Sequence, residues 1–218
     1  MLLGAKTIIH RWLVVIMLCG LFGVFSIAFL DRPIANFFQS YSSRYPQSLL
    51  TLALHVMSHA LDAMFVVVPL GFIGIIWFGL AAKRRVVLTK LELAWALAGF
   101  SVCGSLLVNE FVLKPLFGRY TPSDYFMQHS HYGFVLFGGN LNSSFPSGQA
   151  VLIVSFLSVF WIFFPWLRGL WLALILATLA ALLAVGWHFM SDLAAGGIVG
   201  MTGGMLAVKF GRTGGLRS

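Results

Sequence analysis

WLVVIMLCGLFGVFSIAFL, residues 12–30, decides the fold, because the whole stretch is apolar and carries no charged side chain. An α-helix needs about 20 such residues to cross the hydrocarbon core of a bilayer. The basic residues Lys6, His10 and Arg11 precede the stretch, as they would in a secretory signal. However, it is too long for the apolar part of a signal, and no small-x-small cleavage site follows. The stretch therefore predicts an uncleaved first membrane span.

The composition of the whole chain agrees with a bilayer environment. Hydrophobic residues make up 60% of the 218 residues and charged residues only 9%, which lies outside the range of soluble globular proteins. The formal net charge is +8, but the basic residues are scattered between apolar runs instead of forming one basic face. This pattern excludes a nucleic-acid partner. Cys19 and Cys103 lie in apolar stretches and imply no disulfide framework.

Further apolar runs predict five more spans. We expect these spans at about residues 61–82, 93–113, 146–166, 170–185 and 189–208. The prediction is an all-α polytopic membrane protein with six transmembrane helices in a single domain over residues 1–218. An even number of spans places both termini on one side of the membrane. The sequence does not define an oligomeric state.

The distribution of Lys and Arg predicts the orientation of the spans. With cytoplasmic termini, four basic residues lie outside, namely Arg32, Arg44, Lys114 and Arg119. The other ten lie inside, namely Lys6, Arg11, Lys83, Arg84, Arg85, Lys90, Arg168, Lys209, Arg212 and Arg217. This excess satisfies the positive-inside rule. We therefore expect a bacterial inner membrane protein in which the loop at Lys114, the start of the fourth span and the turn at His188 face the periplasm.

Two of these outward segments are unremarkable when each is taken alone. In KPLFGRYTP, residues 114–122, Lys114 follows Glu110 at the i,i+4 spacing of a helix ion pair. In SSFPSGQ, residues 143–149, a proline suits the first helical turn, and Ser147 and Gly148 leave backbone amides free to meet an anion. Taken alone, the first segment reads as an interfacial basic cluster and the second as an ordinary helix start.

The third outward segment, WHFMSD, residues 187–192, favours chemistry. His188 and Asp192 are four residues apart and lie on one face of a helix. An imidazole whose Nδ1 proton is held by a carboxylate aims its Nε2 lone pair outward, as a nucleophile or general base requires. The alternative is a helix-end pair that satisfies two polar groups. Ionisable residues at membrane depth are more often functional, so function is favoured.

Together the three segments resemble the motifs of the type 2 phosphatidic acid phosphatase superfamily of membrane phosphatases. The shared features are Lys and Pro eight apart, then Pro-Ser-Gly, then His and Asp four apart, in the second half of the chain. The resemblance implies a reaction without metal or other cofactor. His188 would attack phosphorus, Asp192 would orient it, Lys114 would bind the phosphate, and Ser147 with Gly148 would supply the helix-end anion contact.

The chain departs from the family pattern at three places. Thr121 stands where the first motif has Arg before Pro, although Arg119 could reach the same anion. Gln149 replaces the histidine after Pro-Ser-Gly. Ala181 and Leu182 replace the Ser-Arg pair that opens the third motif. One acid and two guanidinium groups are therefore missing.

The glutamine at position 149 bears on the substrate. Gln149 can contact phosphate but cannot deliver a proton, and acid catalysis is typically worth about 10² to 10⁴-fold. A phosphate leaving group is a weaker base than an alkoxide and needs the proton less. The sequence thus favours a polyprenyl diphosphate or a lipid-linked sugar phosphate over phosphatidic acid. Alternatively, His129 or His131 in the long outer loop supplies the proton.

The leading hypothesis is a phosphatase that acts on a membrane lipid phosphate or diphosphate through a phosphohistidine. A lipid-to-lipid phosphotransferase is a close alternative, and a non-catalytic phospholipid-binding or transport member is a distant one. Retention of His188 and Asp192 favours catalysis, because binding needs cations more than an oriented imidazole. His55, His59 and Asp62 have the spacing of metal ligands, but nothing completes the set, so we expect no metal.

Overall fold

A computed structural model of the chain describes residues 2–44, 89–128 and 132–213, and single positions within 52–77. Most described residues are helical. The long helices are α1 (Leu2–Phe29), α2 (Asp31–Arg44), α4 (Lys90–Val108), α7 (Gly148–Phe163), α8 (Arg168–Ala184) and α9 (Met190–Thr213). The short elements are η1 (Asn109–Leu113), α5 (Lys114–Leu116), β1 (Phe117–Gly118), α6 (Pro122–Gln128), β2 (Val135–Leu136) and η2 (Pro165–Leu167).

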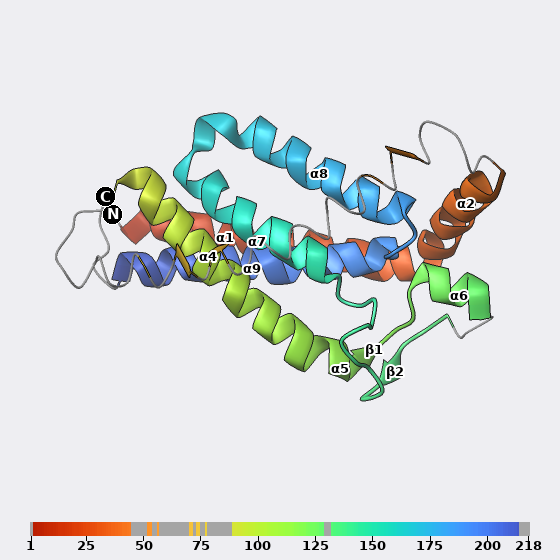
Figure 1. The fold of residues 1–218 in the computed structure, drawn as a ribbon. Helices are drawn as coiled ribbons and strands as arrows, with labels where there is room; N and C mark the ends of the chain where they lie inside the picture. Colours follow the sequence, from red (N-terminus) through yellow and green to blue (C-terminus); the bar gives the residue numbers. More distant parts are fainter. Residues whose placement is uncertain are drawn as a thin grey trace.

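The long helices form a bundle in which α9 packs against α7, α4 and α1. The start of α1 and the end of α9 lie at one end of this bundle, and α2, α5, α6, β1 and β2 lie at the other (Figure 1). The strands form a two-residue antiparallel pairing, with Phe117 opposite Leu136 and Gly118 opposite Val135. This pairing is a small departure from the all-α prediction, and it closes the base of the loop that precedes α7.

Several predicted spans are present as helices. Among the described residues, four segments are long and apolar enough to cross a membrane, namely Trp12–Phe29, Lys90–Leu116, Pro165–Ala184 and Met190–Gly211. They correspond to the predicted first, third, fifth and sixth spans, and the shorter apolar helix α7 corresponds to the fourth. The predicted second span, at 61–82, lies almost wholly outside the described residues. The total of six spans, and the single domain over 1–218, therefore stay predictions.

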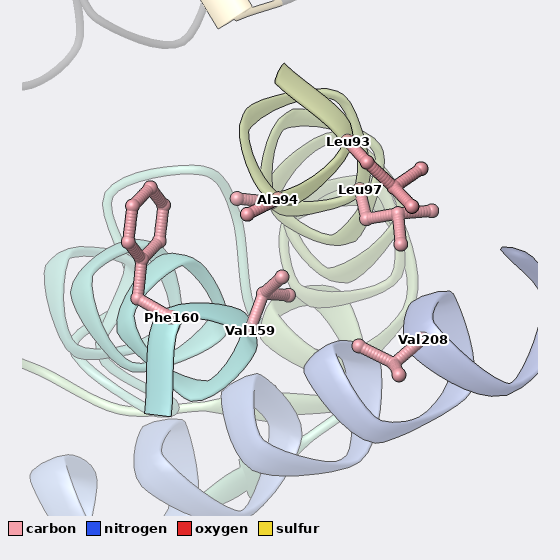
Figure 2. Close-up of a cluster of buried hydrophobic side chains, with 7 residues drawn as sticks. Leu93, Ala94, Leu97, Val159, Phe160 and Val208 are labelled. Atoms are coloured by element: carbon pink, nitrogen blue, oxygen red, sulfur yellow. The ribbon is translucent and has the colours of Figure 1, made fainter. Parts of the chain in front are cut away.

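The burial of each helix agrees with its place in the bundle. Helix α7 is apolar all round and largely buried, as expected for a central helix. At one end its Val159 and Phe160 meet side chains of α4 and α9 (Figure 2). The members of this cluster are Leu93, Ala94, Leu97, Ala98, Val159, Phe160 and Val208. Helix α8 instead exposes leucines at 170, 172, 174 and 176, which is the surface expected to face lipid.

Glycines bring α7 and α9 into close contact. A β-carbon at Gly196 would lie 2.7 Å from the Ser147 carbonyl oxygen, and one at Gly200 would lie 2.8 Å from the Ser155 nitrogen. Small residues at such positions let two helix backbones approach in a membrane, where packing drives association. The first turns of α7 and α9 are thereby held next to each other.

We expect Gly200→Ala to lower the free energy of unfolding by about 1–3 kcal/mol, because the new methyl group overpacks this contact. Thermal unfolding of the purified protein in detergent measures the change. Gly197→Ala is the matched control on the same helix, because a β-carbon there meets nothing within 4 Å in the described chain. Equal destabilisation by both substitutions would contradict the close packing of α7 and α9.

Candidate active site

The three predicted segments meet at the end of the bundle opposite the chain termini. The Ser147 amide donates to the Asp192 carbonyl oxygen at 3.2 Å, which joins the first turns of α7 and α9. Asn109 Nδ2 donates to the Pro146 carbonyl oxygen at 3.3 Å, which joins the end of α4 to the same place. Residues far apart in the sequence thus share one polar site.

His188 is buried, and its tautomer follows from its partners. Nδ1 lies 3.0 Å from the carbonyl oxygen of Ser144. Because a carbonyl oxygen can only accept, Nδ1 carries a proton. Nε2 lies 2.9 Å from Gln149 Oε1. In the neutral imidazole Nε2 holds the lone pair, and a half-rotation of the Gln149 amide would turn its NH2 group toward that lone pair. Gln149 therefore covers the nitrogen that would attack phosphorus.

Asp192 is linked to His188 through Ser144. Its Oδ2 is 3.8 Å from His188 Nδ1, too far for a hydrogen bond. Instead it accepts from the Ser144 hydroxyl, and from the Phe189 amide at 2.8 Å. Ser144 thus bridges the pair, since its hydroxyl binds Asp192 and its carbonyl binds His188. The direct carboxylate contact expected from the spacing is replaced by this bridge, which nothing in the sequence around Ser144 indicates.

Arg119 is enclosed by carboxylates. Its Nη1 donates to Asp192 Oδ1 at 2.5 Å and its Nη2 to Asp31 Oδ2 at 2.8 Å, with the side chain only 1% exposed. The guanidinium also lies 4.2 Å from the ring centre of Phe189. Burial lowers the pKa of Arg119, but the charges of Asp192 and Asp31 outweigh this and raise it. To bind phosphate, as predicted, Arg119 would have to leave both carboxylates.

Asp31 is a site residue that the sequence analysis missed. It is fully buried at the start of α2 and accepts from Arg119, from the Ser191 amide at 3.0 Å and from the Tyr132 hydroxyl at 3.1 Å. Burial and the charge of Asp31 raise the pKa of Tyr132 to about 12, so the phenol stays protonated and donates. A lone acid directly after an apolar span was the available signal.

Lys114 of α5 and Glu110 of η1 lie next to the first turn of α7. Their predicted ion pair is present, with Lys114 Nζ 2.8 Å from Glu110 Oε2, and the ammonium also donates to the Leu141 carbonyl oxygen at 3.0 Å. A β-carbon at Gly148 would lie 2.8 Å from Glu110 Oε1 and 3.7 Å from Lys114 Nζ. The Ser147 hydroxyl accepts from the Ala150 amide at 3.2 Å and caps α7. Lys114, Ser147 and Gly148 are thus brought together.

The π-helical turn η1 positions the Lys114 side of the site. It follows α4 directly and spans Asn109–Leu113, so it carries Asn109 and Glu110. Such turns are rare and frequently lie at functional sites. Widening this one turn changes which residues face α7.

The structure does not describe the remaining candidates. His129 and His131, and the trio His55, His59 and Asp62, fall outside the described residues. Among the residues that the structure describes, no group of three His, Cys, Asp or Glu side chains could hold a metal ion. A narrow, mostly apolar cavity with no room for a water molecule adjoins His188. Its other lining residues are Asp31, Ile34, Ala35, Pro122, Leu183, Phe189 and Met190.

The bundle and its site define a helical membrane protein with a buried, oriented histidine beside an ammonium group and a helix N-terminus. A family model described as the PAP2 superfamily matches residues 91–214. The chain belongs to the PAP2 superfamily, whose members are generally phosphatases. No curated protein and no solved structure matches the chain. The match begins in α4, so α1 and α2, including Asp31, lie outside it.

We expect Arg119→Ala to lower the free energy of unfolding by about 3–5 kcal/mol, because Asp31 and Asp192 would stay buried without their counter-ion. Thermal unfolding in detergent measures this effect. Arg32→Ala is the control, because the exposed Arg32 only covers the Tyr132 ring at 4.3 Å. A stable Arg119→Ala protein whose sole defect is a raised KM would contradict the ion-pair role and favour phosphate binding.

Proposed function

We propose that this protein is an integral-membrane phosphatase that hydrolyses a lipid phosphate or diphosphate through a phosphohistidine on His188. The observation that carries the proposal is the contact between His188 Nδ1 and the Ser144 carbonyl oxygen at 3.0 Å, which places a proton on Nδ1. That arrangement leaves Nε2 as a nucleophile. Membership of a phosphatase superfamily supports the same chemistry.

In the first step, Nε2 of His188 forms a bond to phosphorus as the bond to the leaving oxygen breaks. Lys114 and the Gly148 amide at the start of α7 would stabilise the charge on the phosphoryl oxygens. The Ser147 amide is already bound to the Asp192 carbonyl oxygen. Positive charge develops on the imidazole and is balanced by Asp192 through Ser144. Gln149 swings aside before attack and then contacts phosphate. Water breaks the phosphohistidine in the second step.

A lipid substrate fits the surroundings of the site. The site lies at one end of a bundle whose outer helices expose apolar side chains, as a headgroup site at a membrane face would. The narrow cavity beside His188, which would have to open to admit a lipid, is lined largely by apolar residues, among them Ile34, Leu183 and Met190. These residues suit the hydrocarbon next to the phosphate. With the Lys and Arg distribution of the sequence, we propose that the site faces the periplasm and both termini the cytoplasm.

The side chain at 149 favours a leaving group that departs without a proton. Gln149 is in contact with His188, so it lies where the missing acid would act. We therefore favour a polyprenyl diphosphate or a lipid-linked sugar phosphate over phosphatidic acid. A lipid acceptor in place of water would make the protein a phosphotransferase, and loss of turnover would make it a binding or transport protein.

Replacing His188 by alanine should abolish phosphate release while the protein stays folded. Asp192→Asn should leave a small residue of activity, because orientation is lost but the nucleophile remains. Phosphate release by the purified protein from a panel of lipid phosphates and diphosphates checks both. Undiminished release by His188→Ala would remove the assigned nucleophile, and no release by the unaltered protein would favour the binding or transport alternative.

Gln149→His should raise activity toward lipid monophosphates more than toward diphosphates, because only the former gain from an acid. The ratio of the two rates, measured on the same preparation, is the readout. If a loop histidine already donates the proton, His129→Ala or His131→Ala should severely damage monophosphate hydrolysis, and Gln149→His should add little. An equal effect on both substrate classes would count against the leaving-group argument.

A further inference from the structure

We infer that Glu110 is the general base that activates water when the phosphohistidine is hydrolysed, an inference that rests on the proposed function. The second step needs a group that takes a proton from the attacking water. Gln149 cannot take it. In the first step, the need for an acid depends on the leaving group. In the second step, the need for a base is the same for every substrate, because the leaving group has already gone.

Glu110 lies at the helix end where the phosphate is expected. Its Oε1 accepts from Asn109 Nδ2 at 3.0 Å, and its Oε2 pairs with Lys114 at 2.8 Å. The position of a β-carbon at Gly148 lies 2.8 Å from Oε1, so the carboxylate lies against the α7 backbone and would have to shift if a larger residue replaced Gly148. The next residue, Gln149, touches His188. Glu110 and His188 therefore reach the first turn of α7 at neighbouring residues.

The chemistry of the step agrees with this placement. Phosphoryl transfer runs in line, so the water approaches from the side opposite His188, and its base lies across the phosphate from the imidazole. Glu110 accompanies Lys114, the ammonium expected to hold that phosphate. A carboxylate paired with an ammonium is in its proton-accepting form, and each oxygen keeps a lone pair free.

The step balances without a further reactant. The water oxygen bonds to phosphorus as the bond from phosphorus to Nε2 of His188 breaks, and that electron pair returns to the nitrogen. A proton of the water passes to Glu110, and inorganic phosphate leaves. Glu110 has a side chain 23% exposed and can return its proton to solvent.

Other described acids are less suited. Asp31 and Asp192 are buried and bound to Arg119. Asp124 is bound to the Thr121 side chain at the start of α6. Glu92 caps the far end of α4 through Thr89. A simple surface ion pair would explain the Glu110–Lys114 contact but contributes little to stability. It would not explain why the carboxylate sits against Gly148 on a π-helical turn.

The test follows the two steps separately in the purified full-length protein with a lipid diphosphate labelled with ³²P in its terminal phosphate. With Glu110→Gln, the first equivalent of product should form in a burst, while steady-state turnover falls about 10² to 10⁴-fold. Acid-labile ³²P-labelled protein should accumulate, and adding His188→Ala should abolish the label. Glu92→Gln is the control and should keep normal turnover, because Gln also completes a capping box.

A second measurement does not depend on the glutamine variant. Formate, but not formamide, should restore turnover to Glu110→Ala by supplying the missing carboxylate. Normal turnover in Glu110→Gln, or loss of the burst together with turnover, would overturn the inference, as would the absence of formate rescue. Failure of the unaltered protein to release phosphate would instead overturn the proposed function, so the two failures are distinguishable.

Discussion

The ion pairs of Arg119 with Asp31 and Asp192 are the interaction on which the site depends. The three side chains come from the start of α2, the segment after β1 and the first turn of α9, and they are buried together. Buried charges are tolerated only when their geometry and hydrogen bonds are nearly complete. Asp192, once fixed in this way, holds Ser144, and Ser144 holds the Nδ1 proton of His188. The direction of the nitrogen that we propose as the nucleophile is therefore set by a cation whose partners are carboxylates of the chain itself.

Much of the fold could be predicted from the sequence because its signals are local. Apolar runs of membrane length gave helices at residues 12–29 and 90–116, and the i,i+4 spacing of Glu110 and Lys114 gave a real ion pair. The roles of Ser144 and Arg119 could not be predicted in the same way. Each depends on a partner many positions away, and a cation in a sequence looks the same whether it faces a substrate or a carboxylate of the chain.

The residues covered by the family match do not include every residue of the site. Residues 91–214 carry His188, Lys114 and the start of α7, which are the groups expected to meet phosphate. They also carry Asp192, which is bound to Ser144 and Arg119. Asp31 lies outside that region, yet it is bound to Arg119 and to Ser191. The site of this protein is therefore completed by α2, a helix that the family match does not include. The same helix also lines the cavity beside His188, through Ile34 and Ala35. It therefore contributes both to the ion pairs of Arg119 and to the immediate surroundings of His188.

The order of the charged residues along the chain has a consequence for biogenesis. A ribosome delivers Asp31 first, Arg119 later and Asp192 last, while the spans enter the membrane in that sequence. Until α9 has been made, Asp31 is first without Arg119 and is then paired with Arg119 alone. The buried charge cluster can therefore be completed only after the segment with Asp192 has been made. A chain that stops before α9 would leave Arg119 paired with Asp31 alone, so assembly of the bundle and support of the histidine depend on the same contacts.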